Sequence, residues 1–317
     1  MSIRIGENIP RYNLDEIHAR QNQDQPVQEN IKAPTSDGDI GVYPWHYPQE
    51  SIDVEVVDAR LAALLNGLSP DNVLRKVFAI EVERVGYEVV EEAYEKFIEL
   101  LDGLSDYVRR DAIPEVRIGD ILGYLVKERN FNVGEHEDNL FVEDLLGNNF
   151  DCDTSSLFIL AAAQELGLND NNELSLVYVP GHVFLQWNDG DLQFNYDQGD
   201  FRSDEYYHDN FGEMVVLDLS TSEGQDGIRA LAYFNRGLDK HTIDPDGALV
   251  DYEQAAALMP KLSAAWVGQG IFFLEQSDYE RAEEYFVRAA ELQPNYSVYQ
   301  RNLGYVREMS GNAEGSE

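Results

Sequence analysis

The chain has 317 residues, with 60 acidic and 23 basic side chains and a formal net charge of −37. A field of this sign opposes binding to nucleic acids and to anionic membrane surfaces. No run reaches the roughly 18 apolar residues of a membrane span, no secretory signal opens the chain, and a single cysteine allows no internal disulfide. We therefore expect a cytoplasmic protein without nucleic-acid or membrane partners, long enough for two or three domains.

The first 130 residues divide into a polar arm and a helical layer. Residues 1–50 are rich in Gln, Asn, Asp and Pro, and we expect them to form a mobile N-terminal arm. From Ile52 to Asn130 apolar residues recur with a helical period, and Ser69-Pro70 and Pro114 are helix start signals. We expect this layer to begin a domain that spans residues 51–227.

The only cysteine, Cys152, lies where a polar loop turns into an apolar segment. Residues 157–163 are apolar on every side, which predicts a buried central helix, and Gly167 is its stop signal. Good N-terminal capping residues surround the cysteine: Asp151, Asp153 and Thr154. A thiol in this position receives the positive end of the helix dipole and unpaired N–H groups, so the sequence predicts a thiol that ionises readily.

A β-hairpin is predicted in GHVFLQWNDGDLQFNYD, residues 181–197, where Asp189-Gly190 is a strong two-residue turn signal. Symmetric pairing about this turn gives one apolar face, with the pairs Trp187 and Leu192, Leu185 and Phe194, and Val183 and Tyr196. The opposite face pairs Gln186 with Gln193, Phe184 with Asn195, and His182 with Asp197. Opposed Cβ atoms lie about 4.5–5.5 Å apart, so we expect a hydrogen bond between His182 and Asp197. Further strands are expected at Leu174–Val179 and, as an edge, at Met214–Leu219.

A thiol at a helix start, a histidine on a strand and a carboxylate that orients it fulfil the roles of a Cys-His-Asp nucleophilic site. The segments DCDTSSLFILAAAQELGL, VYVPGHVFLQW, FNYDQG and SDEYY resemble the transglutaminase-like cysteine hydrolase superfamily, in particular its sub-group with C-terminal tetratricopeptide repeats. The resemblance covers roughly residues 115–215. It implies an α+β fold with a papain/transglutaminase-like core, in which a buried helix packs on an antiparallel sheet.

The resemblance also implies a role for each residue of the site. Cys152 would be the nucleophile, His182 the general base and Asp197 the orienting acid. We find no counterpart of the side chain that donates to the oxyanion in this family, which leaves the backbone N–H of Cys152 as the expected donor.

Each of these residues also has a structural explanation. A lone cysteine beside a buried helix is commonly a small packed side chain, His182 can be a hydrogen-bonded strand residue, and Asp197 can simply end a strand. A metal site built from Asp151, Cys152, Asp153 and His182 is a further alternative. It lacks a second cysteine and paired histidines, so neither a metal nor another cofactor is expected. The remaining histidines lie in polar, loop-like contexts (His136 and His208) or lack a partner pattern (His18, His46 and His241).

The acidic excess is uneven along the chain. Residues 131–227 contain 21 acidic residues and one basic residue, Arg202, so the predicted catalytic region is almost purely anionic. Such a field attracts cationic substrates, for example a lysine side chain, a polyamine or a basic peptide. Adaptation to high salt explains the same composition, and the sequence leaves both explanations open.

The last ninety residues contain an internal repeat. In one copy, aromatic and small residues occupy tetratricopeptide positions: Trp266, Gly270, Phe273, Ala282, Phe286, Ala289 and Pro294. An upstream copy repeats them with Tyr233, Gly237, Ala248, Tyr252, Ala255 and Pro260. We expect residues 228–317 to form two all-α repeats and a capping helix that dock on the preceding domain. These repeats would bind a protein or peptide partner, or else only brace the fold.

Two functions follow from these observations. The first is a cysteine hydrolase or acyltransferase that acts on amide bonds through a thioacyl intermediate. Within it, a peptidase or amidase is favoured over a transglutaminase, because water is the default acceptor. The alternative is a catalytically inactive transglutaminase-like scaffold that serves as a protein–protein interaction module.

Overall fold

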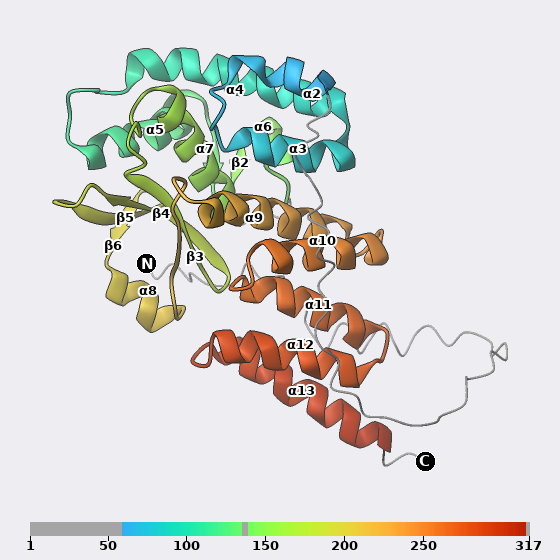
Figure 1. The fold of residues 1–317 in the computed structure, drawn as a ribbon. Helices are drawn as coiled ribbons and strands as arrows, with labels where there is room; N and C mark the ends of the chain where they lie inside the picture. The colour runs from blue at the N-terminus through green and yellow to red at the C-terminus, as the bar shows by residue number, and fades with distance from the viewer. Residues whose placement is uncertain (1–58, 135–138, 315–317) are drawn as a thin grey trace.

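The computed structural model describes residues 59–134 and 139–314 and shows a mixed α+β protein (Figure 1). Helices precede and follow a five-stranded antiparallel sheet. No helix within these ranges is long and apolar enough to span a bilayer. The predicted N-terminal arm, His18, His46 and His136 lie outside the described residues.

The predicted helical layer is present and precedes the five-stranded sheet in the chain. It consists of α2 (Ala59–Leu64), a short 3₁₀ turn (Leu65–Gly67), α3 (Leu74–Val85), α4 (Tyr87–Tyr107), α5 (Pro114–Glu128) and α6 (Phe141–Gly147). Gly86 separates α3 from α4 with a φ of +86°, a conformation that favours glycine. Pro114 opens α5 as predicted, since a proline at the first helical position sacrifices no hydrogen bond. Two short parallel strands, β1 (Asn132–Val133) and β2 (Asn149–Phe150), lie beside α6.

The predicted central helix is α7 (Cys152–Glu165), and Cys152 is its first residue. Asp151 is the N-cap: its carboxylate accepts the Thr154 N–H at 3.0 Å, while the Thr154 hydroxyl accepts the Asp151 N–H at 3.0 Å. Residues 153–163 are buried, because α7 packs between the sheet and the N-terminal helices. The helix ends before Gly167, which has a φ of +65°.

The sheet has the strand order β6-β5-β4-β3-β7, and all neighbours are antiparallel. Its strands are β3 (Leu174–Val179), β4 (His182–Asn188), β5 (Gln193–Asp197), β6 (Asp200–Arg202) and β7 (Val215–Leu217). The edge strand expected at Met214–Leu219 is present as β7. Strand β6 and helix α8 (Asp204–Asn210) were not predicted.

The two faces of the sheet are covered by different helices (Figure 1). Val183, Leu185 and Trp187 of β4 belong to the main core, which includes α7. Phe184 belongs to a smaller cluster on the other face, formed with Val177, Val179, Tyr207 and Phe211. This second cluster lies beneath α8. Because successive side chains of a strand point to opposite faces, α8 covers one face of the sheet and α7 covers the other.

The predicted register of β4 and β5 is wrong by two residues. Leu185 pairs with Tyr196, whereas symmetric pairing about Asp189-Gly190 placed it opposite Phe194. The loop contains residues 189–192, because the Asp189 carboxylate accepts the N–H groups of Asp191 at 3.0 Å and Leu192 at 2.8 Å. This side-chain capping stabilises a four-residue loop instead of a two-residue turn. A shift of two residues preserves the face on which each side chain lies.

The C-terminal part consists of helices stacked in sequence order (Figure 1). They are α9 (Ser222–Lys240), α10 (Pro245–Leu258), α11 (Ser263–Glu275), α12 (Tyr279–Leu292) and α13 (Ser297–Glu314). Gly237 and Gly268 both lie against the buried Tyr252 ring, where a Cβ would come within 2.6 and 2.9 Å of ring carbons. These glycines therefore allow α9, α10 and α11 to pack closely. The expected domain boundary at residue 228 falls inside α9.

Polar contacts join these helices to the rest of the protein. Arg236 of α9 bonds the Ile80 carbonyl oxygen at 2.7 Å and the Glu83 carboxylate at 2.5 Å, both on α3. The Tyr178 hydroxyl on β3 meets the Ser263 hydroxyl at 3.0 Å, and Ser263 meets the Tyr299 hydroxyl at 3.0 Å. The sheet, α11 and α13 are thus connected by a buried hydrogen-bond chain.

Candidate functional site

His182 and Asp197 form the predicted pair. His182 is the first residue of β4 and Asp197 the last of β5, and His182 Nε2 lies 2.8 Å from Asp197 Oδ2. Both side chains are about 93% buried. With the observed register the two residues are diagonal neighbours, not directly opposed, and a diagonal contact is within reach of a histidine ring. The pair still forms because a register shift of two residues leaves both side chains on the same face of the sheet.

Aromatic rings enclose this pair on the α8 side of the sheet. The His182 ring stacks near Phe184, Tyr207 and Phe211, with centroid distances of 6.2, 6.2 and 5.4 Å. The Tyr207 hydroxyl donates a hydrogen bond to Asp197 Oδ2 at 2.9 Å. Sequence reasoning missed Tyr207, because a seven-residue polar helix with one buried side chain has no detectable apolar period.

Cys152 lies next to the start of β4. The Asn188 N–H bonds the Glu173 carbonyl oxygen on the β3 side, so alternation directs the Val183 N–H towards the β5 side. The pairing of β4 with β5 ends at Leu185 and Tyr196, so the Val183 N–H lies past the last paired residues. That N–H faces the Cys152 thiol and favours its ionised form. The nucleophile candidate therefore lies beside the residue that follows His182.

The structure joins His182 to Asp197 but does not join either directly to Cys152. In the described part of the chain no hydrogen bond links Cys152 Sγ to a His182 ring nitrogen. His182 Nδ1 makes no hydrogen bond to residues 59–134 or 139–314, so Asp197 occupies one ring nitrogen and the other is available to a proton donor. Catalytic hydrogen bonds in ligand-free sites are often long and shorten when substrate binds.

The expectation that Cys152 ionises readily is wrong for this structure. Burial raises the pKa of the Cys152 thiol well above its usual value, and the carboxylates of Asp151, Asp153 and Asp197 raise it further. The Val183 N–H opposes this effect but does not outweigh it. The helix dipole is opposed by a low-polarity environment and by neighbouring negative charges, so the Cys152 side chain rests as a neutral thiol.

Asp153 connects the first turn of α7 to α9. Its carboxylate accepts a hydrogen bond from the Asn235 side-chain amide. Burial, followed by the Asp151 carboxylate, raises the pKa of Asp153 well above its usual value. Asn235 comes from the C-terminal helices, and no local sequence signal pointed to it.

Asp151, Cys152 and Asp153 offer potential metal ligands within 4.8 Å of one another. His182, which the metal alternative included, is not part of this cluster of described residues. A set of two carboxylates and one protonated thiol, without a fourth protein ligand from the described residues, gives no preference for a particular ion.

Alkylation of Cys152 tests its protonation state. Because thiolate is the reactive form, we expect the rate with iodoacetamide to rise about tenfold per pH unit through pH 9, without a plateau near neutrality. Asp151→Asn should accelerate alkylation at a given pH by removing a carboxylate that raises the pKa of the Cys152 thiol, whereas Asp170→Asn, at an exposed position, should not. Mass spectrometry gives an unambiguous rate, since Cys152 is the only cysteine. A plateau below pH 8 would contradict the raised pKa.

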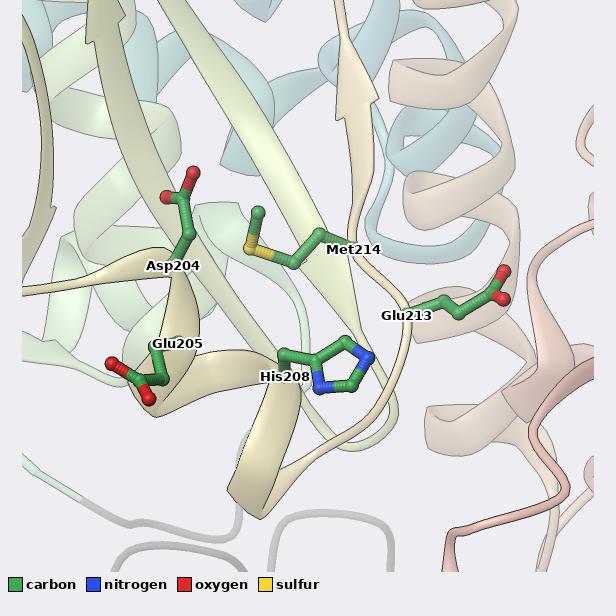
Figure 2. A pocket seen from close by; sticks show the side chains of 5 residues that line it. All are labelled: Asp204, Glu205, His208, Glu213 and Met214. Atoms are coloured by element: carbon green, nitrogen blue, oxygen red, sulfur yellow. The ribbon is translucent and has the colours of Figure 1, made fainter.

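A separate open cavity of about 410 Å³ lies beside α8 (Figure 2). It is lined by Asp204, Glu205, His208, Glu213 and Met214, and by none of the three predicted site residues. In Figure 2 the Met214 side chain points towards Asp204, and Glu213 points away from the other four. His208 lies on α8, not in the expected loop, and its side chain is 68% exposed.

His241 was expected to lack partners and instead is buried between helices. Its Nδ1 lies 3.2 Å from the Tyr252 hydroxyl and its Nε2 lies 3.2 Å from a Glu275 carboxylate oxygen. These contacts join α10 and α11 at the end of α9, so His241 has a packing role.

No protein-family model matches the chain, and no curated protein matches it in sequence. Among solved structures, the chain is similar to menin, described in a crystal structure that reveals the binding site for the Mixed Lineage Leukemia protein. The match has 16% sequence identity and a TM-score of 0.42, and covers 75% of this chain and 69% of the menin chain. A similarity at this level assigns neither a family nor a function.

Proposed function

We propose that the protein is a cysteine hydrolase of transglutaminase-like type, which cleaves amide bonds with Cys152, His182 and Asp197. The observation that carries this proposal is the buried 2.8 Å contact between His182 Nε2 and Asp197 Oδ2, because the Asp197 carboxylate also acts on the Cys152 thiol at the start of α7. Support also comes from the arrangement of the core, where α7 packs against the antiparallel strands β3 and β4. An imidazole oriented by a carboxylate is the general base that a neutral thiol requires.

The neutral thiol determines the order of the chemical steps. His182 Nδ1 takes the Cys152 proton as Sγ attacks the substrate carbonyl carbon, while Asp197 holds the Nε2 proton. The carbonyl oxygen becomes an anion, which the Cys152 N–H in the first turn of α7 would bind. The carbon–nitrogen bond then breaks, and the leaving amine receives the proton from His182. Water, deprotonated by the same ring, hydrolyses the thioester and releases the acid and the free thiol.

Negative charge around the nucleophile favours a cationic acyl donor. Asp151, Asp153 and Asp197 all act on the Cys152 thiol, and residues 131–227 contain a single basic residue, Arg202. A positive group bound near these carboxylates would also lower the free energy of the thiolate, so substrate binding itself would promote ionisation of Cys152. We therefore propose lysine-type acyl groups as the preferred class.

A chromogenic ester tests the proposal. With Nα-acetyl-lysine p-nitrophenyl ester, we expect a burst of p-nitrophenolate and an acetyl-lysyl adduct on Cys152 that is visible by mass spectrometry after acid quench. The matched acetyl-glutamate ester should react more slowly. Turnover should disappear in Cys152→Ala and fall roughly 100- to 10,000-fold in His182→Ala.

His208→Ala is the matched control, because this histidine is exposed and lies outside the proposed machinery. Its turnover should equal that of the unmodified protein. Equal ester cleavage by Cys152→Ala and the unmodified protein would exclude the thioacyl mechanism.

A second candidate function is a catalytically inactive scaffold that binds a protein partner. It is favoured by one observation, the absence of a hydrogen bond between Cys152 and His182 among the described residues. Helix α11 is buried from Ser263 to Leu274, so a partner of the predicted repeats would meet mainly the outward sides of α10, α12 and α13. Failure of both esters, together with a Cys152 alkylation rate unchanged by His182→Ala, would favour the scaffold.

A further inference from the structure

Helix α8 covers the sheet face that carries His182 and Asp197, and one of its side chains points into the pair. Tyr207 is fully buried, and its ring stacks on Phe184 with a centroid distance of 3.6 Å and an interplanar angle of 9°. The same ring is nearly parallel to that of His182, at 17°. This packing restricts the ring, so the position of the Tyr207 hydroxyl is fixed by the aromatic cluster.

The Tyr207 hydroxyl donates to Asp197 Oδ2 at 2.9 Å, and His182 Nε2 meets the same oxygen at 2.8 Å. We propose that Tyr207 is a positioning residue that lowers the proton affinity of His182 by sharing Asp197 Oδ2 with it. The inference rests on the proposed function, in which His182 accepts the proton of Cys152.

The physical argument concerns charge on a single oxygen. A hydrogen bond from a hydroxyl stabilises the Asp197 carboxylate and reduces the negative charge that it offers to His182. Imidazolium is then stabilised less than it would be by an unshared carboxylate. Burial, followed by the Asp197 carboxylate, raises the pKa of Tyr207 above its usual value, so its hydroxyl remains a donor at all pH values of interest.

Other titratable and charged groups also face the pair. They are Cys152 from α7, Tyr206 from α8, and Asp200 and Arg202 from β6. All of them remain in place when only the Tyr207 hydroxyl is removed. A comparison of Tyr207→Phe with the unmodified protein therefore isolates the shared hydrogen bond.

The test is a titration of His182 by NMR in protein labelled with ¹⁵N-histidine. In Tyr207→Phe, which keeps the ring stack, we expect the His182 midpoint to rise by about one pH unit, the scale of one charge-assisted hydrogen bond. The ¹⁵N shifts of both ring nitrogens should change with it. Tyr206→Phe is the matched control, because Tyr206 is the adjacent, half-buried tyrosine of the same helix and makes no hydrogen bond to Asp197 among the described contacts.

A second variant keeps the inference testable if Tyr207→Phe fails to fold. Incorporation of 3-fluorotyrosine at position 207 makes the hydroxyl a stronger donor, so the His182 midpoint should move in the opposite direction, to lower pH. An unchanged midpoint in folded Tyr207→Phe, or a fluorotyrosine shift of the same sign, would overturn the proposal. The titration needs no substrate, so its outcome is independent of the ester assay. If the unmodified protein cleaved neither ester while Tyr207→Phe still shifted the His182 midpoint, only the proposed hydrolase function would be rejected.

Discussion

Glu81→Gln should make the protein more resistant to unfolding at pH 8 than the unmodified chain, although it removes a buried carboxyl group. Glu81 of α3 is 1% exposed and accepts the N–H groups of Phe141 and Val142 at 3.0 Å, which caps α6. Burial raises the pKa of Glu81 from 4.5 to about 8, and the two N–H bonds only partly oppose this effect. The folded protein therefore prefers a protonated Glu81.

The sign of the pH dependence follows from this preference. Between pH 4.5 and about 8 the folded state binds more protons than the unfolded state, so the contribution of Glu81 to stability is complete below pH 4.5 and is lost as pH rises to about 8. A shift of this size corresponds to a loss on the order of 4–5 kcal/mol. Glu81→Gln should remove that dependence, although it weakens one cap bond.

Urea unfolding of both proteins at pH 5, 6, 7 and 8 measures the effect. The difference in free energy of unfolding between Glu81→Gln and the unmodified protein should increase with pH in favour of the variant. Glu91→Gln, at an exposed position of α4, should give a difference that does not vary with pH. A constant difference for Glu81→Gln as well would show that Glu81 titrates normally.

Arg236→Ala should cause a large loss of stability. The Arg236 guanidinium is 6% exposed and forms two bonds to Asp251, at 2.9 Å and 2.6 Å, in addition to its contacts with α3. Its removal leaves Asp251, which is 1% exposed, with Lys240 at 2.9 Å as its remaining cationic contact in the part of the chain that the structure describes. Breaking a buried ion pair from one side costs roughly 3–5 kcal/mol, because a charge is left poorly compensated.

Chemical denaturation at pH 7 measures this loss, and Arg288→Ala is the matched control. Arg288 is 46% exposed and approaches Glu291 at 3.5 Å within α12, so its loss should change stability by less than about 1 kcal/mol. The double variant Arg236→Ala with Asp251→Ala should lose less than the sum of the single losses. Strict additivity would show that the pair contributes nothing as a unit.

Local signals predicted the elements that carry the candidate site. The capping residues around Cys152 and the apolar run after it correctly placed α7, and alternation correctly placed the strands and their faces. The register failed at Asp189, because its capping of two N–H groups depends on a side-chain conformation that composition does not reveal. The contact between His182 and Asp197 survived this error because it depends on the face and not on direct opposition.

Contacts between distant elements were not predictable from one sequence. Asn235 bonds Asp153, and Arg236 bonds Asp251 and α3, but neither residue has a neighbouring motif that identifies its partner. The thiol environment was mispredicted for the same reason. The helix start argued for an ionised Cys152, whereas burial by the surrounding elements reversed the balance.

The bond between Asn235 and Asp153 also bears on how the protein is made. The two residues are separated by 82 positions, and the bond joins the turn that holds Cys152 to a helix synthesised much later. During translation this turn must wait for α9 to leave the ribosome before its hydrogen bonds are complete. Contacts of such long range slow folding, so the turn that holds Cys152 completes its side-chain hydrogen bonds only after α9 has docked.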